Sequence, residues 1–200
     1  MLPDARLLTV AAATGLEARA ARRAAPQLRV IETGVGLSRV NGSALGDVVI
    51  SCGIAGALQP GLGSGSVVVP HRVMRPDGEV LECDQDLANG LDAAARRLGF
   101  VPSRGALVTT MTLLSGPERT LWAQRGYQTV DMETGLIRAG RVACIRVVLD
   151  TPERELSGAW LRPWTIPFRP DAWGQVGWVV REAPRCARLA AAVLAEALKE

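Results

Sequence analysis

The stretch Asp47–Gly65, DVVISCGIAGALQPGLGSG, decides the fold class of this chain. Its apolar start predicts a buried strand over Asp47–Ser51, and glycines follow at positions 53, 56, 61, 63 and 65. Glycine lets backbone amides approach an anion or a sugar closely, although the same residues also serve plain turns. A dinucleotide fingerprint would continue into a helix, whereas Ser66–Pro70 predicts a second strand. The pattern therefore indicates a glycine turn between two strands.

Outward from this turn, short apolar runs alternate with amphipathic stretches along the chain. Further strands are predicted over Leu7–Ala13, Leu28–Thr33, Ala106–Thr110, Thr129–Met132 and Ala143–Leu149. Helices are predicted over Leu16–Ala25, Arg39–Leu45, Asp84–Leu98, Pro117–Arg125, Glu133–Gly140 and Pro184–Leu198. The alternation predicts an α/β sheet with helices on both faces, and the lack of a long linker or repeat indicates a single domain over residues 1–200.

The composition excludes several kinds of chemistry. The 200 residues carry a net charge of +3, and the arginines are scattered rather than clustered as nucleic-acid binding requires. The one histidine, His71, cannot build a multi-histidine metal site, and the one lysine, Lys199, stands beside the terminus. We therefore expect no metal, no cofactor and no nucleic acid. The chemistry is left to carboxylates, arginines, hydroxyls and backbone amides.

The N-terminal residues and the cysteines predict a cytoplasmic protein. The apolar run Leu7–Ala13 is short and follows the acidic Asp4, which is unlike a signal peptide. Every apolar run is shorter than the roughly 18 residues that a membrane span needs. The cysteines are far apart and form no C-x-x-C pair, which favours a reduced compartment; they are Cys52, Cys83, Cys144 and Cys186.

One predicted strand delivers carboxylates to its end in the sequence TVDMET, which starts at Thr129. In open α/β sheets, ligands bind at the carboxyl ends of strands. A carboxylate there can accept hydrogen bonds from two sugar hydroxyls, and Met132 offers a soft apolar surface to a sugar or base. Alternatively, Asp131 or Glu133 only caps the helix that follows.

Further candidates follow other predicted strands. The run ACIRVVLD ends in Asp150, where a buried acid can have a raised pKa and donate a proton, or can simply be a turn residue. In ATGLEARAARR, residues 13–23, Glu17 can orient a water and Arg19 can hold an anion. In TGVGLSR, residues 33–39, Arg39 can do the same.

Taken in order, these segments resemble the nucleoside phosphorylase / nucleosidase superfamily. The matching features are Glu17 after an early strand, TGVG at 33–36, CGIAGAL at 52–58, VDME at 130–133 and VVLD at 147–150. The resemblance implies a three-layer αβα fold with a twisted mixed central sheet. It is closest to the hopanoid-associated phosphorylases, on the GIAGAL-x-P-x-L pattern, the short chain and the C-terminal pattern from Pro184. The chain departs from that superfamily in Ile54, where nucleosidases carry a small hydroxyl residue, and in the apolar Val48–Ile50, where hexameric phosphorylases carry a phosphate-binding arginine.

The resemblance also implies roles for residues. Asp150 would donate a proton to the adenine, and Glu17, or an anion site with Arg19 and Arg39, would place water or phosphate. Substrate contacts would come from Met132, Glu133, Gly53, Ile54, Ala55, Gly56 and Leu114. The expected reaction is phosphorolysis of a 5′-substituted adenosine such as adenosylhopane, in a homo-oligomer, with phosphate as the co-substrate. The alternatives are a hydrolytic methylthioadenosine/adenosylhomocysteine-type nucleosidase and a non-catalytic nucleoside-binding module.

The segment Trp160–Trp178, WLRPWTIPFRPDAWGQVGW, fits neither a regular helix nor a regular strand. It contains Trp160, Trp164, Trp173 and Trp178, together with three prolines. Tryptophan suits a pocket mouth or a membrane–water boundary, which would accommodate a lipid tail on the nucleoside and a peripheral membrane contact. The alternative is that the rings pack on the sheet or in a subunit interface.

Overall fold

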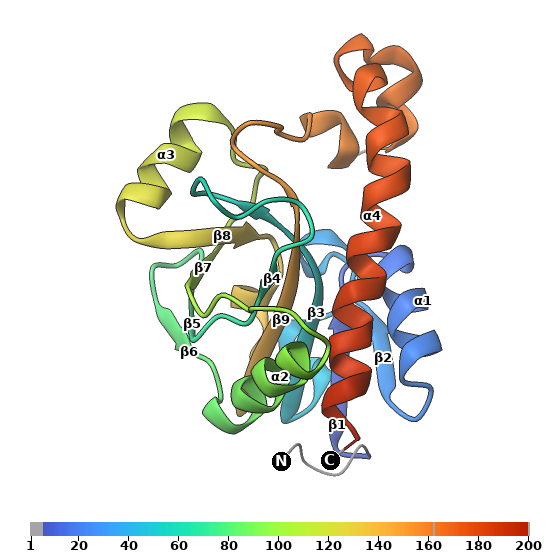
Figure 1. Cartoon of the computed structure of the whole chain (residues 1–200), viewed down its shortest axis with the longest axis vertical. Coiled ribbons are helices and arrows are strands. Elements are labelled where there is room, and N and C mark those ends of the chain that lie inside the picture. Colours follow the sequence, from blue (N-terminus) through green and yellow to red (C-terminus); the bar gives the residue numbers. More distant parts are fainter. Residues whose placement is uncertain (1–5, 162, 200) are drawn as a thin grey trace.

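The computed structural model describes residues 6–161 and 163–199, and their strands form one mixed sheet (Figure 1). The strand order is β2-β1-β3-β8-β7-β5-β6, and β9 pairs with β3 and β4. Strand β3 runs parallel to β1 and β9 but antiparallel to β8, which confirms the expected mixed sheet. The bounds are β1 Leu8–Ala12, β2 Arg29–Glu32, β3 Val48–Ala57, β4 Val67–Val68, β5 Arg72–Met74, β6 Val80–Glu82, β7 Ala106–Thr109, β8 Tyr127–Asp131 and β9 Arg141–Asp150.

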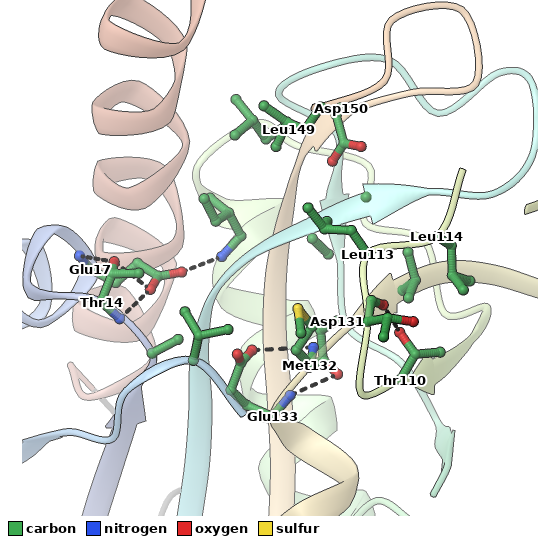
Figure 2. Close-up of a pocket in the computed structure, with 18 of the residues that line it drawn as sticks. Thr14, Glu17, Thr110, Leu113, Leu114, Asp131, Met132, Glu133, Leu149 and Asp150 are labelled. Carbon is green, nitrogen blue, oxygen red and sulfur yellow. Dashed lines mark hydrogen bonds between the residues drawn. The ribbon is translucent and has the colours of Figure 1, made fainter. Parts of the chain in front are cut away.

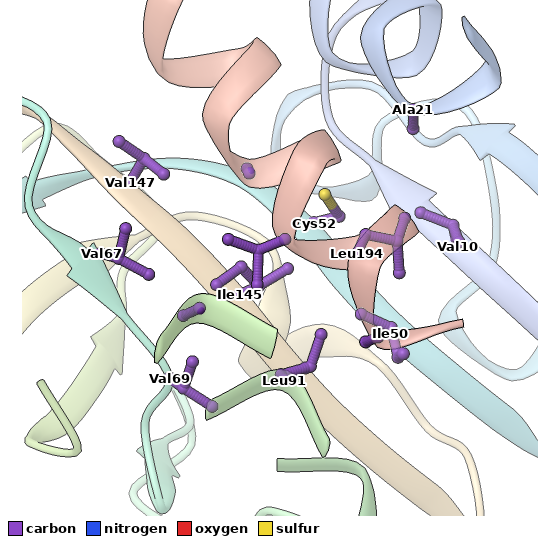
Figure 3. Close-up of a cluster of buried hydrophobic side chains, with 14 of the residues drawn as sticks. Val10, Ala21, Ile50, Cys52, Val67, Val69, Leu91, Ile145, Val147 and Leu194 are labelled. Atoms are coloured by element: carbon purple, nitrogen blue, oxygen red, sulfur yellow. The ribbon is translucent and has the colours of Figure 1, made fainter. Parts of the chain in front are cut away.

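Three helices cover one face of the central strands: α1 (Gly15–Ala24), α2 (Gln85–Arg97) and α4 (Pro170–Ala197). Their main core cluster joins side chains of β1, β3 and β9 to helical residues such as Leu91 and Leu194 (Figure 3). Helix α3 (Gly116–Gln124) packs on β8 in a separate cluster with Leu114, and it lies away from α1 and α4 in Figure 1.

The other face of β1, β3 and β9 is covered by 3-10 turns rather than by the α-helices expected over Arg39–Leu45 and Glu133–Gly140. These turns are Val35–Leu37, Gly42–Leu45 and Thr134–Leu136. Glycines interrupt both predicted helices, and a glycine in a helix interior costs about 1 kcal/mol relative to alanine. Two of the turns also touch so closely that a Cβ at Gly42 would lie 2.2 Å from the carbonyl oxygen of Leu136.

The last helix is longer than predicted. It begins at Pro170, so Pro184 lies inside it rather than in its first turn, and the second half of the Trp160–Trp178 segment is helical. A proline costs a helix about 3 kcal/mol, but the residues around it pack into the main core at helical spacing. Buried side chains before and after the proline, including Trp178, Val179, Cys186 and Ala190, outweigh that cost.

Alternation along β9 separates the core from the opposite side of the sheet. Ala143, Ile145 and Val147 face the main core cluster. Because successive side chains of a strand point to opposite faces, Arg146 and Asp150 project to the other side. The strands β5 and β6 were not predicted, since three residues each are too few to show a period.

Candidate active site

A cavity of about 150 Å³ lies where β3, β8 and β9 end and α1 begins. Four carboxylates line it: Glu17 from α1, Asp131 at the end of β8, Glu133 after β8 and Asp150 at the end of β9; Glu17, Glu133 and Asp150 lie on three sides of it (Figure 2). Among the other predicted contact residues, Ile54, Ala55, Gly56, Leu114 and Met132 also line it. The structure thus brings together residues from 17 to 150 that the sequence analysis selected separately.

Glu17 is held by a capping box at the start of α1. Its Oε2 accepts hydrogen bonds from the backbone N–H of Thr14 at 2.8 Å and from the Thr14 hydroxyl at 2.7 Å. Its Oε1 accepts a bond of 2.8 Å from the backbone N–H of Ile54. Gly53 does not line the cavity but permits this approach, because a Cβ there would lie 2.2 Å from Glu17 Oε1. One carboxylate therefore caps a helix and faces the cavity.

Glu133 is buried, and its carboxylate meets backbone donors from two segments. Oε1 accepts a bond of 3.1 Å from the N–H of Gly36, in the predicted TGVG turn, and Oε2 accepts one of 3.3 Å from the N–H of Met132. Burial and the nearby Asp131 carboxylate raise the pKa of Glu133 to about 8, although Arg146 opposes the shift. The side chain is thus held at the cavity wall by backbone donors from two segments.

Asp131 organises the turn that carries Glu133. Its Oδ2 forms a buried ion pair with Arg146 Nη2 at 2.7 Å, and it accepts a bond of 3.2 Å from the N–H of Thr134. The hydroxyl of Thr109 donates to Oδ1 at 2.6 Å, and Arg146 Nη2 also donates to Ser51 Oγ at 2.7 Å. Buried charges need such paired, hydrogen-bonded partners. Asp131 thus accepts from the backbone at the start of the Thr134–Leu136 turn, whose N-cap residue, Glu133, makes no side-chain capping bond.

Asp150 pairs with a buried arginine that the sequence analysis missed. Arg119 Nη2 donates to Asp150 Oδ2, and both side chains are almost fully buried. Burial raises the pKa of Asp150 above its ordinary value, while the positive charge of Arg119 opposes that rise. A Cβ at Gly56 would lie 3.0 Å from Asp150 Oδ1, so this glycine makes room for the ion pair. Asp150 therefore sits in an environment that favours holding a proton, with a cation as the opposing influence.

The two arginines predicted to hold phosphate lie elsewhere. Arg19 donates from Nε to the carbonyl oxygen of Gly15 and lines a separate surface cavity between α1 and α4. Arg39 is exposed and pairs with Glu32. Neither lines the cavity that holds the carboxylates.

Two buried arginines that pair with the carboxylates Asp150 and Asp131 escaped prediction for different reasons. Arg146 interrupts an apolar strand four residues before Asp150, and that spacing places both on one face, so a partner for it could have been expected. Arg119 lies on a nine-residue helix with little amphipathic pattern, and such a helix marks no residue as buried. In the described part of the chain, no cluster of His, Cys, Asp or Glu could hold a metal ion, and no helix could cross a bilayer.

The family model of the phosphorylase superfamily matches residues 24–157, and the chain belongs to that superfamily, as the resemblance indicated. It is therefore an enzyme of the class that cleaves N-glycosidic bonds. No curated protein matches the sequence significantly.

Solved structures share the fold across the whole chain. A methylthioadenosine-bound nucleosidase mutant from Helicobacter pylori is 12% identical with a TM-score of 0.74, covering 96% of this chain and 98% of that one. The S-adenosylhomocysteine nucleosidase from Streptococcus pyogenes is 15% identical with a TM-score of 0.74, covering 100% and 98%. The futalosine hydrolase of Helicobacter pylori is 12% identical with a TM-score of 0.71, covering 97% of each chain.

Proposed function

We propose that this chain cleaves the N-glycosidic bond of a purine nucleoside, an adenine nucleoside in the first instance. The observation that carries the proposal is the placement of Asp150, Glu133 and Glu17 on three sides of one cavity. The structural neighbours that bind methylthioadenosine and its analogues support the choice of a purine substrate.

The three carboxylates match the three tasks of the reaction. Cleavage passes through an oxocarbenium-like state, so the base must accept a proton or hydrogen bond as it leaves, the ribose must be gripped, and a nucleophile must reach C1′. Asp150 serves the base, Glu133 accepts hydrogen bonds from the 2′- and 3′-hydroxyls beside Met132, and Glu17 orients the nucleophile. Proton donation by a positioned acid contributes about 10²–10⁴ in rate.

The charges at the cavity favour water as the nucleophile over the phosphate expected from the resemblance. Arg119 is the guanidinium among the lining residues, and its donors go to Asp150, to the carbonyl of Ala57 at 2.8 Å and to the carbonyl of Leu114 at 3.0 Å. A phosphate dianion beside Glu17 would meet a carboxylate rather than a cation, and like charges repel. We therefore propose hydrolysis, with phosphorolysis as the second candidate, which the resemblance to hopanoid-associated phosphorylases supports.

The deciding experiment incubates the protein with adenosine, methylthioadenosine and inosine, each with and without phosphate. The free base, the free sugar and the sugar 1-phosphate are measured for each substrate. Hydrolysis predicts equal base release in both conditions and no sugar 1-phosphate. Release only with phosphate would overturn hydrolysis, and tight nucleoside binding with no release would favour a binding module. The variant Asp150→Asn controls for a contaminating activity.

For the 5′ substituent, we propose an apolar group that contacts the exposed aromatic residues before and within α4. Phe168 is 83% exposed and Trp173 is 58% exposed, whereas Trp178 is buried in the main core and Trp160 packs against it. The side chain of Trp164 and all of Arg162 lie outside the described residues. Gln175 connects this segment to the cavity, because its Oε1 accepts a bond of 3.0 Å from the N–H of Ser157, next to the lining residue Leu156.

The test compares Trp173→Ala with Val101→Ala, a control at another exposed apolar site. For an adenosine with a lipid tail, kcat/KM should fall in Trp173→Ala and stay constant in Val101→Ala, while plain adenosine is unaffected. Equal losses on both substrates would contradict the proposal. Vesicle cosedimentation tests a peripheral membrane contact, and light scattering tests the proposed homo-oligomer.

A further inference from the structure

Arg119 lies between two carboxylates at the base-facing end of the cavity. Its side chain is 2% exposed and donates to Asp150 Oδ2 on one side. On the other side, Glu155 Oε1 lies 3.6 Å from Arg119 Nε, and Glu155 is 27% exposed. Glu155 Oε1 also accepts a bond of 2.8 Å from the N–H of Gly116, which holds its charge in place at the start of α3.

This arrangement gives the cluster one more negative charge than positive charge when both carboxylates are ionised. A buried group with such an imbalance tends to take up one proton, because like charges raise each other's proton affinity. Glu155 remains in contact with solvent, whereas Asp150 is almost fully desolvated. Desolvation disfavours the charged form, so the proton belongs on Asp150. Burial raises the pKa of Asp150, in the direction that this desolvation argument gives.

We propose that Arg119 and Glu155 are positioning residues that decide whether Asp150 holds the proton it delivers to the departing base. This rests on the proposed function of Asp150 as the general acid. Arg119 orients the carboxylate and favours its ionised form. The negative charge of Glu155 partly offsets the positive charge of Arg119 and so raises the proton affinity of Asp150. After transfer to the base, Asp150 is left as a carboxylate beside Arg119, an ion pair that stabilises the product state.

The other titratable groups at the cavity have partners of their own and do not take the roles of Arg119 and Glu155. Glu17 is occupied by Thr14 and Ile54, and Glu133 by Gly36 and Met132. Asp131 also lines the cavity, and its charge is matched by Arg146. The alternative is a purely structural Arg119, which ties the carbonyls of Ala57 and Leu114 together.

The experiment measures the titration of Asp150 directly, by carbon NMR of the carboxyl group in protein labelled at aspartate, without substrate. The assignment comes from Asp150→Asn. Removing the cation in Arg119→Met should raise the pKa of Asp150 by about one to three units. Removing the second carboxylate in Glu155→Gln should lower it, on the order of half a unit, because solvent screens the partly exposed Glu155. The control Glu118→Gln removes an exposed carboxylate from α3, the helix that carries Arg119, and should leave the pKa of Asp150 unchanged.

The same variants are then followed through the pH profile of kcat/KM. Since the proton on Asp150 is required, activity falls as pH rises through its pKa. The alkaline limb should therefore move to lower pH in Glu155→Gln and to higher pH in Arg119→Met. Unmoved titrations in folded Glu155→Gln, or shifts equal to those of Glu118→Gln, would overturn the inference. Opposite NMR shifts in a protein that cleaves no nucleoside would uphold the control of Asp150 protonation by Arg119 and Glu155, but would reject the proposed function and with it the delivery of the proton to a base.

Discussion

Glu17 Oε1 accepts a hydrogen bond of 2.8 Å from the backbone N–H of Ile54, across the position where Gly53 has no side chain. A methyl group at residue 53 would lie 2.2 Å from that oxygen. The first glycine in CGIAGAL, Gly53, is therefore required by a carboxylate from 36 residues earlier in the chain, rather than by a bound anion.

The first prediction concerns this contact. Gly53→Ala should displace Glu17 and lower kcat about 10²-fold, since displacement of a catalytic group by about 1 Å costs that much. The matched control is Gly63→Ala, where an added Cβ meets nothing within 4 Å. Steady-state kinetics and thermal melting of both variants check it. Equal activity in the two variants would show that Glu17 has no catalytic role.

The second prediction concerns Asp150. Asp150→Asn keeps the shape beside Arg119 but cannot deliver a proton, so kcat should fall by about 10² or more. Circular dichroism should show an unchanged fold, since the amide oxygen still accepts from the guanidinium. Near-normal turnover would remove Asp150 from its assigned role.

The third prediction concerns ribose recognition by Glu133. Above about pH 8, where the carboxyl of Glu133 is ionised, Glu133→Gln loses charge-assisted hydrogen bonds, which are roughly twice as strong as neutral ones. Its kcat/KM should fall strongly on ribosides and little on 2′,3′-dideoxynucleosides, which lack the two hydroxyls. Similar losses on both substrates would mean that Glu133 acts on something other than the sugar.

The fourth prediction follows from the pKa of Glu133, which burial and Asp131 raise to about 8. An unfolded chain releases this proton near pH 4.5, whereas the folded protein keeps it until about pH 8. The contribution of this group to the free energy of unfolding is therefore fully present below pH 4.5 and is lost as pH rises through about 8. Each unit of pKa difference corresponds to about 1.4 kcal/mol.

Glu133→Gln removes that pH dependence. The unfolding free energy of the variant minus that of the unmodified protein should therefore be larger at pH 9 than at pH 5, as measured by urea unfolding at both pH values. A constant difference in unfolding free energy across this range would show that Glu133 is ionised throughout.

The sequence by itself determined the main strands in their order along the chain, and it selected all three carboxylates, Glu17, Glu133 and Asp150, as candidates. Strands buried on both faces appear as apolar runs, and the end of such a run is visible as a change in residue type. Glu133 and Asp150 each stand at such an end, so their place at the edge of the sheet follows from local pattern alone. The family match agrees with that order of segments.

Only the tertiary structure decided which charges meet. Arg119 reaches Asp150 across 31 residues, Glu17 reaches Ile54 across 37, and Arg146 meets Asp131 across 15. Hydrophobic periodicity reports whether a residue faces a core, but a buried charge is stabilised by partners that converge from other elements, and local pattern carries no record of them. For the same reason, the sequence did not show that Arg19 and Arg39 lie outside the cavity. Their sequence neighbours give no indication of which side of α1 or of the turn faces it.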